Sequence, residues 1–333
     1  MDTRKLGTDG PEVSALGLGA MGMSDLYGPA DEAEGIATIH AAIDAGITMI
    51  DTGDFYGSGH NEMLIRDALR QRDRDDVVIS VKFGSRRSPD GAFQPVPADT
   101  DPAAVKDRLA YTLRRLGTDH VDIYRPTRLN PNVPIEDTVG AIAEMVQAGY
   151  VRHIGLSEVG VATLRRAAAV HPISDLQIEY SLLSRGVEAE ILPAARELGI
   201  GVTAYGVLSR GLLSGHWRPD RALTGGDFRG QVPRFQGENL AANLALVDAL
   251  RTVAASIGAT VAQVAVAWVA SRGTDIVPLI GARRRDRLQE SLAAADLVLD
   301  EAALRAIESA VPAGAAAGDR YPAQQMAVLD SER

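Results

Sequence analysis

Three side chains that can move protons lie where buried strands are expected to end. Asp51 closes the run Thr48–Asp51, and Tyr56 follows it by five residues. Lys82, one of only three lysines in the chain, closes the almost wholly apolar run Val77–Lys82. A lysine that ends such a run is hard to explain as a surface residue. The three residue types together point to acid–base chemistry.

These side chains predict a proton relay if the strand ends meet. A buried ammonium needs a carboxylate partner, because desolvation disfavours its charged form, and it would lower the pKa of a phenol from about 10. We therefore expect Asp51 to hold Lys82, and Lys82 to acidify Tyr56, which gives a proton to a carbonyl oxygen. The alternative is a structural ion pair beside a turn tyrosine. Three such residues on adjacent strand ends favour the relay.

Short β-branched runs alternate along the chain with amphipathic helical segments, which is the pattern of βα units around a parallel sheet. The predicted strands are Ala15–Gly19, Thr48–Asp51, Val77–Lys82, Val121–Arg125, Val151–Leu156, Asp175–Ile178, Gly201–Tyr205 and Ile276–Ile280. The predicted helices are Asp31–Ala45, Asn61–Arg70, Pro102–Leu116, Ile135–Ala148, Val161–His171, Val187–Leu198, Val261–Ser271 and Arg285–Ala295.

The eight βα units predict an α/β fold, a single-domain (β/α)8 TIM barrel. No linker rich in Pro, Gly and Ser divides the series, so residues 1–333 are expected to form one domain. The barrel itself is expected over about residues 15–295, a usual length for this fold. In such a barrel the carboxyl ends of the strands carry the chemistry, and this is where the three reactive side chains lie.

Three segments lie outside the eight units. The turn Thr8-Asp9-Gly10-Pro11 predicts an N-terminal hairpin that caps the bottom of the barrel. The connection from Ser209 to about Asn239 is too long for a plain connector and predicts a lid or binding loop, followed by an extra helix at Leu240–Ile257. We expect two extra helices in all, and a C-terminal extension, residues 296–333, that docks at the substrate pocket.

Composition excludes several classes of function. The chain has no cysteine, which excludes disulfides, thiolate metal sites and a cysteine nucleophile, and its six histidines are scattered, so no metal site is expected. A net charge of −10 argues against nucleic-acid and membrane-surface partners. No apolar run of about 18 residues and no export signal is evident, which predicts a cytoplasmic protein with a small-molecule partner. The sequence does not decide between a monomer and a homo-oligomer.

One motif points to a different fold and is rejected. Gly17, Gly19 and Gly22 fit the GxGxxG pattern of dinucleotide-binding Rossmann units. In that fold the glycines open a helix at once, and an acidic residue follows about 20 residues later. Here the next helix is expected near Asp31, and Asp51 follows after about 30 residues, so the context does not match.

The order of motifs from about Arg4 to Ala294 resembles that of the aldo-keto reductases. The matching segments are Gly17-Leu18-Gly19-Ala20-Met21-Gly22; Asp51 to Gly57; Lys82; Val121-Asp122-Ile123-Tyr124; Ile154-Gly155-Leu156-Ser157-Glu158; Gln177-Ile178-Glu179-Tyr180; Ala204-Tyr205 followed by Gly211-Leu212-Leu213-Ser214-Gly215; and Pro278-Leu279-Ile280-Gly281-Ala282-Arg283. Each segment alone is a weak signal, whereas eight in register are a strong one.

This resemblance implies an NADP-dependent oxidoreductase that moves hydride between NADPH and an aldehyde or ketone. It implies Tyr56 as general acid, assisted by Lys82 and Asp51, and Tyr205 stacked on the nicotinamide. Three residues would hydrogen-bond the nicotinamide carboxamide: Ser157, Glu158 and Gln177. Asp51 would also approach the ribose. Further residues implied along the cofactor are Gly19, Ala20, Met21, Gly206, Leu208, Ser209, Arg210, Gly211, Ile280, Gly281 and Ala282, and Met21 would also face the substrate.

The adenosine end of the cofactor is expected after the last strand. There a helix begins next to several arginines, so that backbone N–H groups, the helix dipole and guanidinium groups converge. Arg283 and Arg287 are the candidates for the 2′-phosphate, and Glu290 and Ser291 for the adenine. The alternative is an arginine-rich helix face in an arginine-rich protein.

The sequence departs from the family at two positions. Thr127 stands where the family normally has a histidine that orients the substrate carbonyl, and Gly206 begins a Gly-Val pair where Ser-Pro is frequent. If the chain stays extended, Arg125 and Thr127 share one face and would jointly replace the imidazole as donors. We expect Arg125 or Arg128 to position an anionic or polyoxygenated substrate.

Two alternatives keep the cofactor but change the function. One is an NADP-binding, redox-sensing protein with little turnover. The other is an isomerase or lyase that uses the cofactor only transiently. Net consumption of the cofactor separates the reductase from both alternatives, and conversion of a substrate without net consumption would single out the second.

Overall fold

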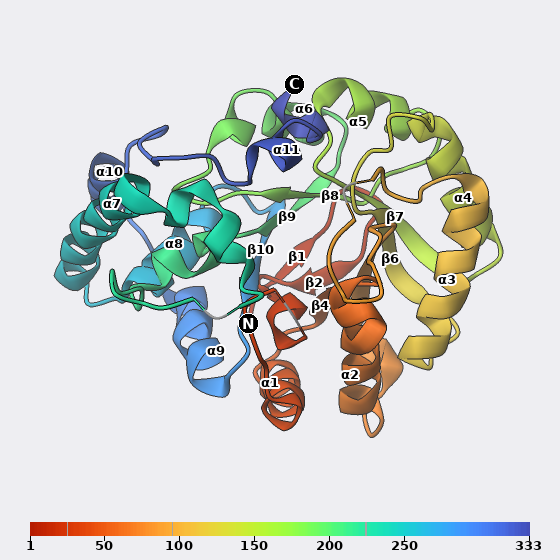
Figure 1. Ribbon diagram of the computed structural model, residues 1–333, viewed down its shortest axis with the longest axis horizontal. Coiled ribbons are helices and arrows are strands. Elements are labelled where there is room, and N and C mark those ends of the chain that lie inside the picture. Colours follow the sequence, from red (N-terminus) through yellow and green to blue (C-terminus); the bar gives the residue numbers. More distant parts are fainter. Residues whose placement is uncertain (25, 95, 224) are drawn as a thin grey trace.

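The computed structural model describes residues 1–24, 26–94, 96–223 and 225–333. Eight parallel strands close a barrel in the order β10-β3-β4-β5-β6-β7-β8-β9, and helices surround it (Figure 1). The single-domain (β/α)8 TIM barrel is thereby confirmed. The strands are β3 (Gly17–Gly19), β4 (Met49–Gly53), β5 (Val78–Phe83), β6 (Val121–Pro126), β7 (Val151–Ser157), β8 (Asp175–Glu179), β9 (Gly201–Tyr205) and β10 (Ile276–Gly281).

Strand register brings the reactive side chains to one end of the barrel. Asp51 lies opposite Ser80, Gly53 lies opposite Lys82, and Lys82 lies opposite Arg125 on the next strand. Every predicted strand is present, with ends that differ from the prediction by up to about two residues, as expected for boundaries drawn from pattern alone. The carboxyl ends of β4 and β5 are therefore neighbours, as the relay requires.

Helices lie between the strands close to where the sequence predicted them. They are α1 (Glu32–Asp44), α2 (His60–Leu69), α3 (Pro102–Leu116), α4 (Ile135–Gln147), α5 (Val161–Ala168), α6 (Ile191–Glu197), α8 (Val261–Ala270) and α9 (Arg285–Leu292). Local signals set their ends: Asp101 caps α3 through two backbone N–H groups, and Gly117 ends it in a left-handed conformation. α6 is shorter than predicted, because a separate 3-10 turn, Gly186–Glu188, precedes it.

The additional segments take the expected positions. An antiparallel hairpin, β1 (Thr3–Lys5) and β2 (Glu12–Ser14), closes the bottom, where Arg4 donates to the carbonyls of Ala270 and Gly273 at 3.0 Å each. The two extra helices, α7 (Gly237–Ser256) and α10 (Glu301–Ala310), pack on each other. The segment after α10, residues 311–333, is called the tail below. Through the short helix α11 (Ala323–Met326) it runs towards α5 and α6 (Figure 1).

Among the described residues, no single helix has the length and hydropathy to span a membrane. α7 and α8 meet that test only as a pair, with a bend of 86° between them.

Candidate active site

Asp51 and Lys82 form a buried ion pair at the carboxyl ends of β4 and β5. Lys82 Nζ lies 2.5 Å from Asp51 Oδ1 and also donates to the carbonyl of Thr52 at 3.0 Å. The other carboxylate oxygen, Asp51 Oδ2, accepts from Gln177 Nε2 at 2.7 Å and from Ser80 Oγ at 3.1 Å. With donors on both oxygens and about 4% exposure, the carboxylate has a fixed direction.

Tyr56 lies beside this pair. Its ring centroid is 5.0 Å from Lys82 Nζ, and its hydroxyl is hydrogen-bonded to no described residue. Burial, followed by the charge of Asp51, raises the pKa of the Tyr56 phenol well above its usual value of 10.0. Burial also lowers the pKa of Lys82, although Asp51 opposes this. The net shift is therefore opposite to the acidification expected from Lys82: burial and Asp51 raise the pKa of Tyr56, and Arg128 opposes them.

Arg125 does not reach the mouth of the barrel. Its guanidinium is fully buried inside the barrel, where it donates to Asp175 Oδ2 at 2.8 Å, Thr203 Oγ1 at 3.1 Å and Ser80 Oγ at 2.7 Å. A Cβ on Gly155 would lie 2.6 Å from Asp175 Oδ1, so a glycine there leaves room for the pair. The expectation that Arg125 binds substrate, alone or jointly with Thr127, is wrong for this reason.

Three predicted site residues have buried hydroxyls without a partner. Thr127 Oγ1, Ser157 Oγ and Ser209 Oγ are inaccessible and accept or donate no hydrogen bond among the described residues. They follow or end β6, β7 and β9, at the same end of the barrel. Buried polar atoms without a partner are rare in native proteins, and each one calls for an explanation such as a ligand or an ordered water. The predicted mouth of the barrel therefore contains three buried hydroxyl groups that have no hydrogen-bond partner among the described residues.

Backbone strain is concentrated at the same end. The non-glycine residues with positive φ in the described chain follow β3, β4, β7 and β9: Leu26, Ser58, Glu158, Ser209 and Arg210. Such conformations cost of order 1–3 kcal/mol each and persist only where the surroundings enforce them, often at ligand sites. Three of them are residues for which the sequence implied cofactor contacts.

Two carboxylates and two arginines form an ionic cluster above the barrel interior. Glu158 and Glu179 are at most 1% exposed. Arg320 of the tail donates to both oxygens of Glu158, at 3.1 and 2.6 Å, and to Glu179 at 3.4 Å. Arg210 donates to Glu179 at 3.1 Å. Burial alone would raise the pKa of Glu158, but the charge and hydrogen bonds of Arg320 outweigh it, with help from Arg128, and lower it to about 2.

Two phenols and a guanidinium connect this cluster to Tyr56. The Tyr205 hydroxyl donates to Glu158 Oε1 at 2.7 Å and lies 2.9 Å from the hydroxyl of Tyr321, in the tail. Arg128, which is half-buried, donates to that Tyr321 hydroxyl at 3.3 Å and to the carbonyl of Thr127 at 2.7 Å. The tail thus supplies part of the mouth, and Arg128 is a cation there in addition to Lys82.

The remaining residues implied along the cofactor lie on neighbouring strand ends. Gly281 pairs with Gly19 across β10 and β3, and Gly19 pairs with Asp51 across β3 and β4. The backbone N–H of Ala20 donates to the carbonyl of Asp51 at 3.0 Å. Ile280 lies within β10, and the others occupy the turns that continue these strands: Met21, Gly206, Leu208, Gly211 and Ala282. One continuous row of strand ends, from β4 through β3 and β10 to β9, therefore brings them together.

The predicted adenosine-binding residues are close to one another, but their charges are already engaged. Arg283 donates to the carbonyls of Tyr27 and Pro29 at 3.1 and 3.2 Å, and Arg287 donates to Glu290 at 3.2 Å. Ser291 is buried on α9, whose first N–H group, that of Arg285, donates to Glu34 Oε1 at 3.0 Å. Glu34 was not predicted, because it lies on α1 and only the packing of α1 against α9 brings it here.

The family model for the aldo/keto reductase family matches residues 15–312 of this chain. The chain belongs to the aldo/keto reductase family. It is therefore an oxidoreductase that reduces carbonyl groups, as the motifs implied. A probable aldo-keto reductase from Glycine max is 42% identical over 320 residues, which cover 95% of this chain and 91% of that relative.

Solved aldo-keto reductase structures share the architecture. A glycerol dehydrogenase from Gluconobacter oxydans superposes with a TM-score of 0.83 at 29% identity, covering 93% of this chain and 94% of the other. An aldo-keto reductase from Bacillus halodurans, solved in its holo form, gives 0.76 at 26% identity, with 94% and 97% covered.

Sequence reasoning missed the tail residues of the site. Arg320 and Tyr321 stand in the segment Gly318-Asp319-Arg320-Tyr321-Pro322, which was expected to dock but was given no role. Glu179 was quoted only as part of a motif, although it pairs with Arg210 and Arg320. An arginine followed by an aromatic residue in a tail with many apolar residues was the available signal, since such a residue often anchors a docked segment.

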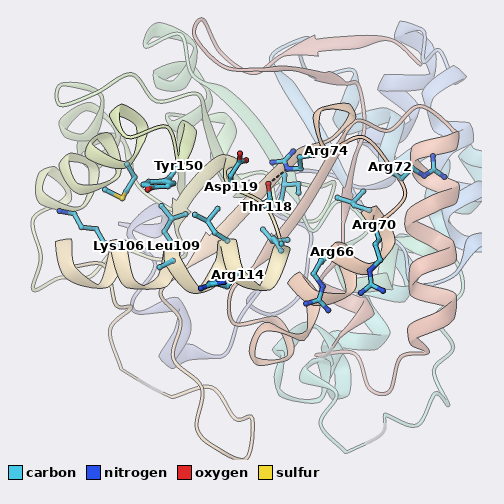
Figure 2. A pocket seen from close by; sticks show the side chains of 17 residues that line it. Arg66, Arg70, Arg72, Arg74, Lys106, Leu109, Arg114, Thr118, Asp119 and Tyr150 are labelled. Atoms are coloured by element: carbon cyan, nitrogen blue, oxygen red, sulfur yellow. Dashed lines mark hydrogen bonds between the residues drawn. The ribbon is translucent and has the colours of Figure 1, made fainter.

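A large hollow of the surface is not part of this site. It encloses about 1200 Å³ and lies outside the barrel wall, between α2 and α3 (Figure 2). Its rim is rich in cations, but carboxylates pair with several of them: Arg72 with Asp44, Arg74 with Asp122, and Lys106 with Glu144. It contains no acid–base pair comparable with Asp51 and Lys82.

Proposed function

We propose that this protein reduces an aldehyde or ketone to an alcohol, reversibly, with NADPH, and that Tyr56 is its general acid. The observation that carries the proposal is the cluster of Tyr56, Lys82 and Asp51 at one end of the barrel. In a TIM barrel this end is the place of catalysis. Membership of the aldo/keto reductase family supplies the reaction class.

The residues present fit a nicotinamide dinucleotide. Ser157 offers an unpartnered buried hydroxyl where an amide is expected, and Ser209 offers another where the pyrophosphate is expected. Gln177 stands between Asp51 and Ser157 on the strand ends, and Tyr205 offers an aromatic face beside them. When bound, the cofactor would supply the hydride. Arg283 and Arg287 would have to exchange their present partners for the 2′-phosphate.

Tyr56 is suited to hold a proton until it is needed. Because its pKa is raised, the phenol remains protonated at neutral pH, and its unbonded hydroxyl can donate to a carbonyl oxygen. Lys82 stands beside the ring and would stabilise the phenolate left after the transfer, while Asp51 keeps Lys82 oriented. In the reverse direction the phenolate of Tyr56, stabilised by Lys82, would accept the proton of an alcohol.

Thr127 and Arg128 take the place of the family histidine in this proposal. The Thr127 hydroxyl is buried and unpartnered, so it can bind a carbonyl oxygen. Arg128 adds a positive charge near Tyr56, which favours an anionic or polyoxygenated substrate. Met21, in the turn after β3, would line the same pocket.

The test is oxidation of NADPH, followed by its absorbance, with aldehydes, ketoacids and sugars as substrates. Trp217 is the useful fluorescence reporter for binding, because it packs on Phe235 in the long connection at the mouth, whereas Trp268 is buried in α8. Tyr56→Phe should lower turnover at least about 100-fold and leave the NADPH dissociation constant nearly unchanged. Unchanged turnover in Tyr56→Phe would remove the proposed general acid.

The alternatives differ in cofactor consumption. Tight NADPH binding without turnover on any substrate would favour a redox-sensing protein, and conversion without net oxidation would favour a transient-redox isomerase or lyase. Three further expectations remain predictions from the sequence. They are a small-molecule substrate without nucleic-acid or membrane partners, a cytoplasmic location, and a site that holds no metal.

A further inference from the structure

One side chain of the tail sets the direction of a carboxylate in the site. Arg320 is 7% exposed, and its two terminal nitrogens each donate to a different oxygen of Glu158. A guanidinium that holds both oxygens fixes the plane of a carboxylate as well as its position. Glu158 follows β7 with a strained backbone, at φ 53°, so its orientation depends on such partners.

The fixed carboxylate in turn fixes Tyr205. Glu158 Oε1 accepts from the Tyr205 hydroxyl at 2.7 Å and from the N–H of Glu179 at 3.0 Å. Glu158 Oε2 accepts from Ser331 Oγ, a second tail residue, at 2.6 Å. A third tail residue, Asp330, accepts the N–H of Gly160, two residues after Glu158, at 2.8 Å. The tail therefore contacts the end of β7 at several points, with Arg320 the most deeply placed.

We propose that Arg320 is a positioning residue of the cofactor site, which holds Glu158 and, through it, Tyr205 in the geometry that receives the nicotinamide. The site is then complete only when the tail is docked. This inference rests on the proposed function, because Glu158 and Tyr205 are cofactor residues only if NADPH binds here.

The charge of Arg320 matters because Glu158 is buried beside another carboxylate. The titratable or charged groups that face Glu158 come from four places: Arg320 on the tail, Tyr205 on β9, Glu179 on β8 and Arg128 after β6. Without Arg320, burial and the charge of Glu179 would favour the protonated carboxyl. A protonated Glu158 loses acceptor capacity for the Tyr205 hydroxyl and for an amide N–H. Removal of Arg320 should therefore make NADPH binding depend on pH.

The experiment compares NADPH dissociation constants of four full-length proteins from about pH 5.5 to about pH 8.5. They are the wild type, Arg320→Gln, Arg320→Lys and the control Arg333→Gln. The control removes a tail arginine whose side chain, within the described part of the chain, donates only to the carbonyl of Ala327. Dividing each variant's constant by that of the wild type at the same pH cancels titration of the cofactor's own phosphate, whose second pKa is about 6.

For Arg320→Gln the ratio should increase as the pH falls, from about threefold at the alkaline end to about thirtyfold or more at the acid end, since one pKa unit corresponds to tenfold. Arg320→Lys keeps the charge but cannot hold both oxygens, so its ratio should stay near about threefold at every pH. The ratio for Arg333→Gln should stay near one.

Three results would overturn the inference. The first is a ratio near one for Arg320→Gln. The second is a raised ratio for Arg320→Gln that is the same at every pH, which would indicate only a loosened tail. The third is an unchanged dissociation constant for Arg320→Lys. The last result decides the matter if Arg320→Gln does not fold. Absence of NADPH binding by the wild type would overturn the proposed function itself. This outcome differs from a failure of the inference about Arg320, because it is seen in the unsubstituted protein.

Discussion

The Arg125–Asp175 pair inside the barrel and the Arg320–Glu158 pair at its mouth have the same chemistry and similar burial. In both, a guanidinium nitrogen donates to a carboxylate oxygen at 2.8 Å or less. Arg125 binds partners on β5, β8 and β9, all of which belong to the barrel wall. Arg320 joins the tail to the end of β7, in contact with Tyr205.

If Arg320 positions the cofactor site as proposed, depth along the barrel, and not residue type, separates a structural ion pair from a functional one. Below the mouth, the Arg125 pair is fully buried within the barrel, and Ser80 Oγ links Arg125 to Asp51. At the mouth, the Arg320 pair stands next to unpartnered hydroxyls and strained backbone. The predictions below test this contrast, beginning with the largest expected effect.

The interior pair should affect stability and leave binding alone. Arg125→Met leaves Asp175 buried without its cation, which typically costs about 3–5 kcal/mol of unfolding free energy. Urea unfolding should show this loss, while the NADPH dissociation constant of the folded protein changes less than about twofold. Adding Asp175→Leu should recover much of the loss, because an apolar pair avoids the unpaired charge. A large change in NADPH affinity without loss of stability would reverse the contrast.

The mouth pair should contribute a pH-dependent part of stability. The pKa of Glu158 is about 2 in the folded protein and 4.5 as its ordinary value, so the folded state prefers the ionised form. The resulting stabilisation, about 3 kcal/mol, is present above pH 4.5 and is lost as the pH falls towards 2. Urea unfolding between these limits should show a shallower acid loss for Glu158→Gln than for the wild type. Identical pH slopes would contradict the assignment.

The two arginines at the expected adenosine site should be able to exchange their present partners for a ligand, as expected for side chains at the mouth of the barrel. Arg283 donates to neutral carbonyls and Arg287 to an exposed pair, so both can turn to a phosphate at small cost. Replacing both by alanine should weaken NADPH about thirtyfold and NADH about threefold or less, because only NADPH offers charge-assisted bonds to the 2′-phosphate. Binding titrations with the two cofactors measure this. Equal losses would count against the 2′-phosphate site.

Arg128 should act mainly on the substrate. Arg128→Gln keeps a donor towards Tyr321 but removes the charge near Tyr56. KM for a ketoacid should rise about tenfold, and KM for an uncharged aldehyde should hardly change, because only the anion loses an ionic partner. Steady-state kinetics with such a matched pair measure the effect. An equal rise in KM for both substrates would indicate that Arg128 acts through the shape of the pocket and not through its charge.

The sequence predicted most of the barrel because its signals are local. Apolar runs that end at Asp51 and Lys82 mark strand ends, and Asp101 and Gly117 mark the ends of a helix. The same locality explains the error at Arg125. Alternation along a strand tells which face a side chain takes, but not whether it lies deep in the barrel or at its mouth.

Residues brought by distant packing could not be predicted in the same way. Glu34 reaches α9 only because α1 packs there, and Arg320 reaches Glu158 only because the tail crosses the mouth. The pKa of Tyr56 depends on burial and on several charges together, so the residue types around it could be predicted from the sequence, but the direction of the net shift could not.

The Arg320–Glu158 contact also has a consequence for folding kinetics, since it joins residues 162 positions apart. Contacts of such long sequence separation close large loops and are expected to form after the local βα units. An interaction that is absent from the folding transition state leaves the folding rate unchanged and slows unfolding. The docked tail would therefore slow unfolding. Unfolding would begin with the loss of the contact between the tail and Glu158, which completes the site.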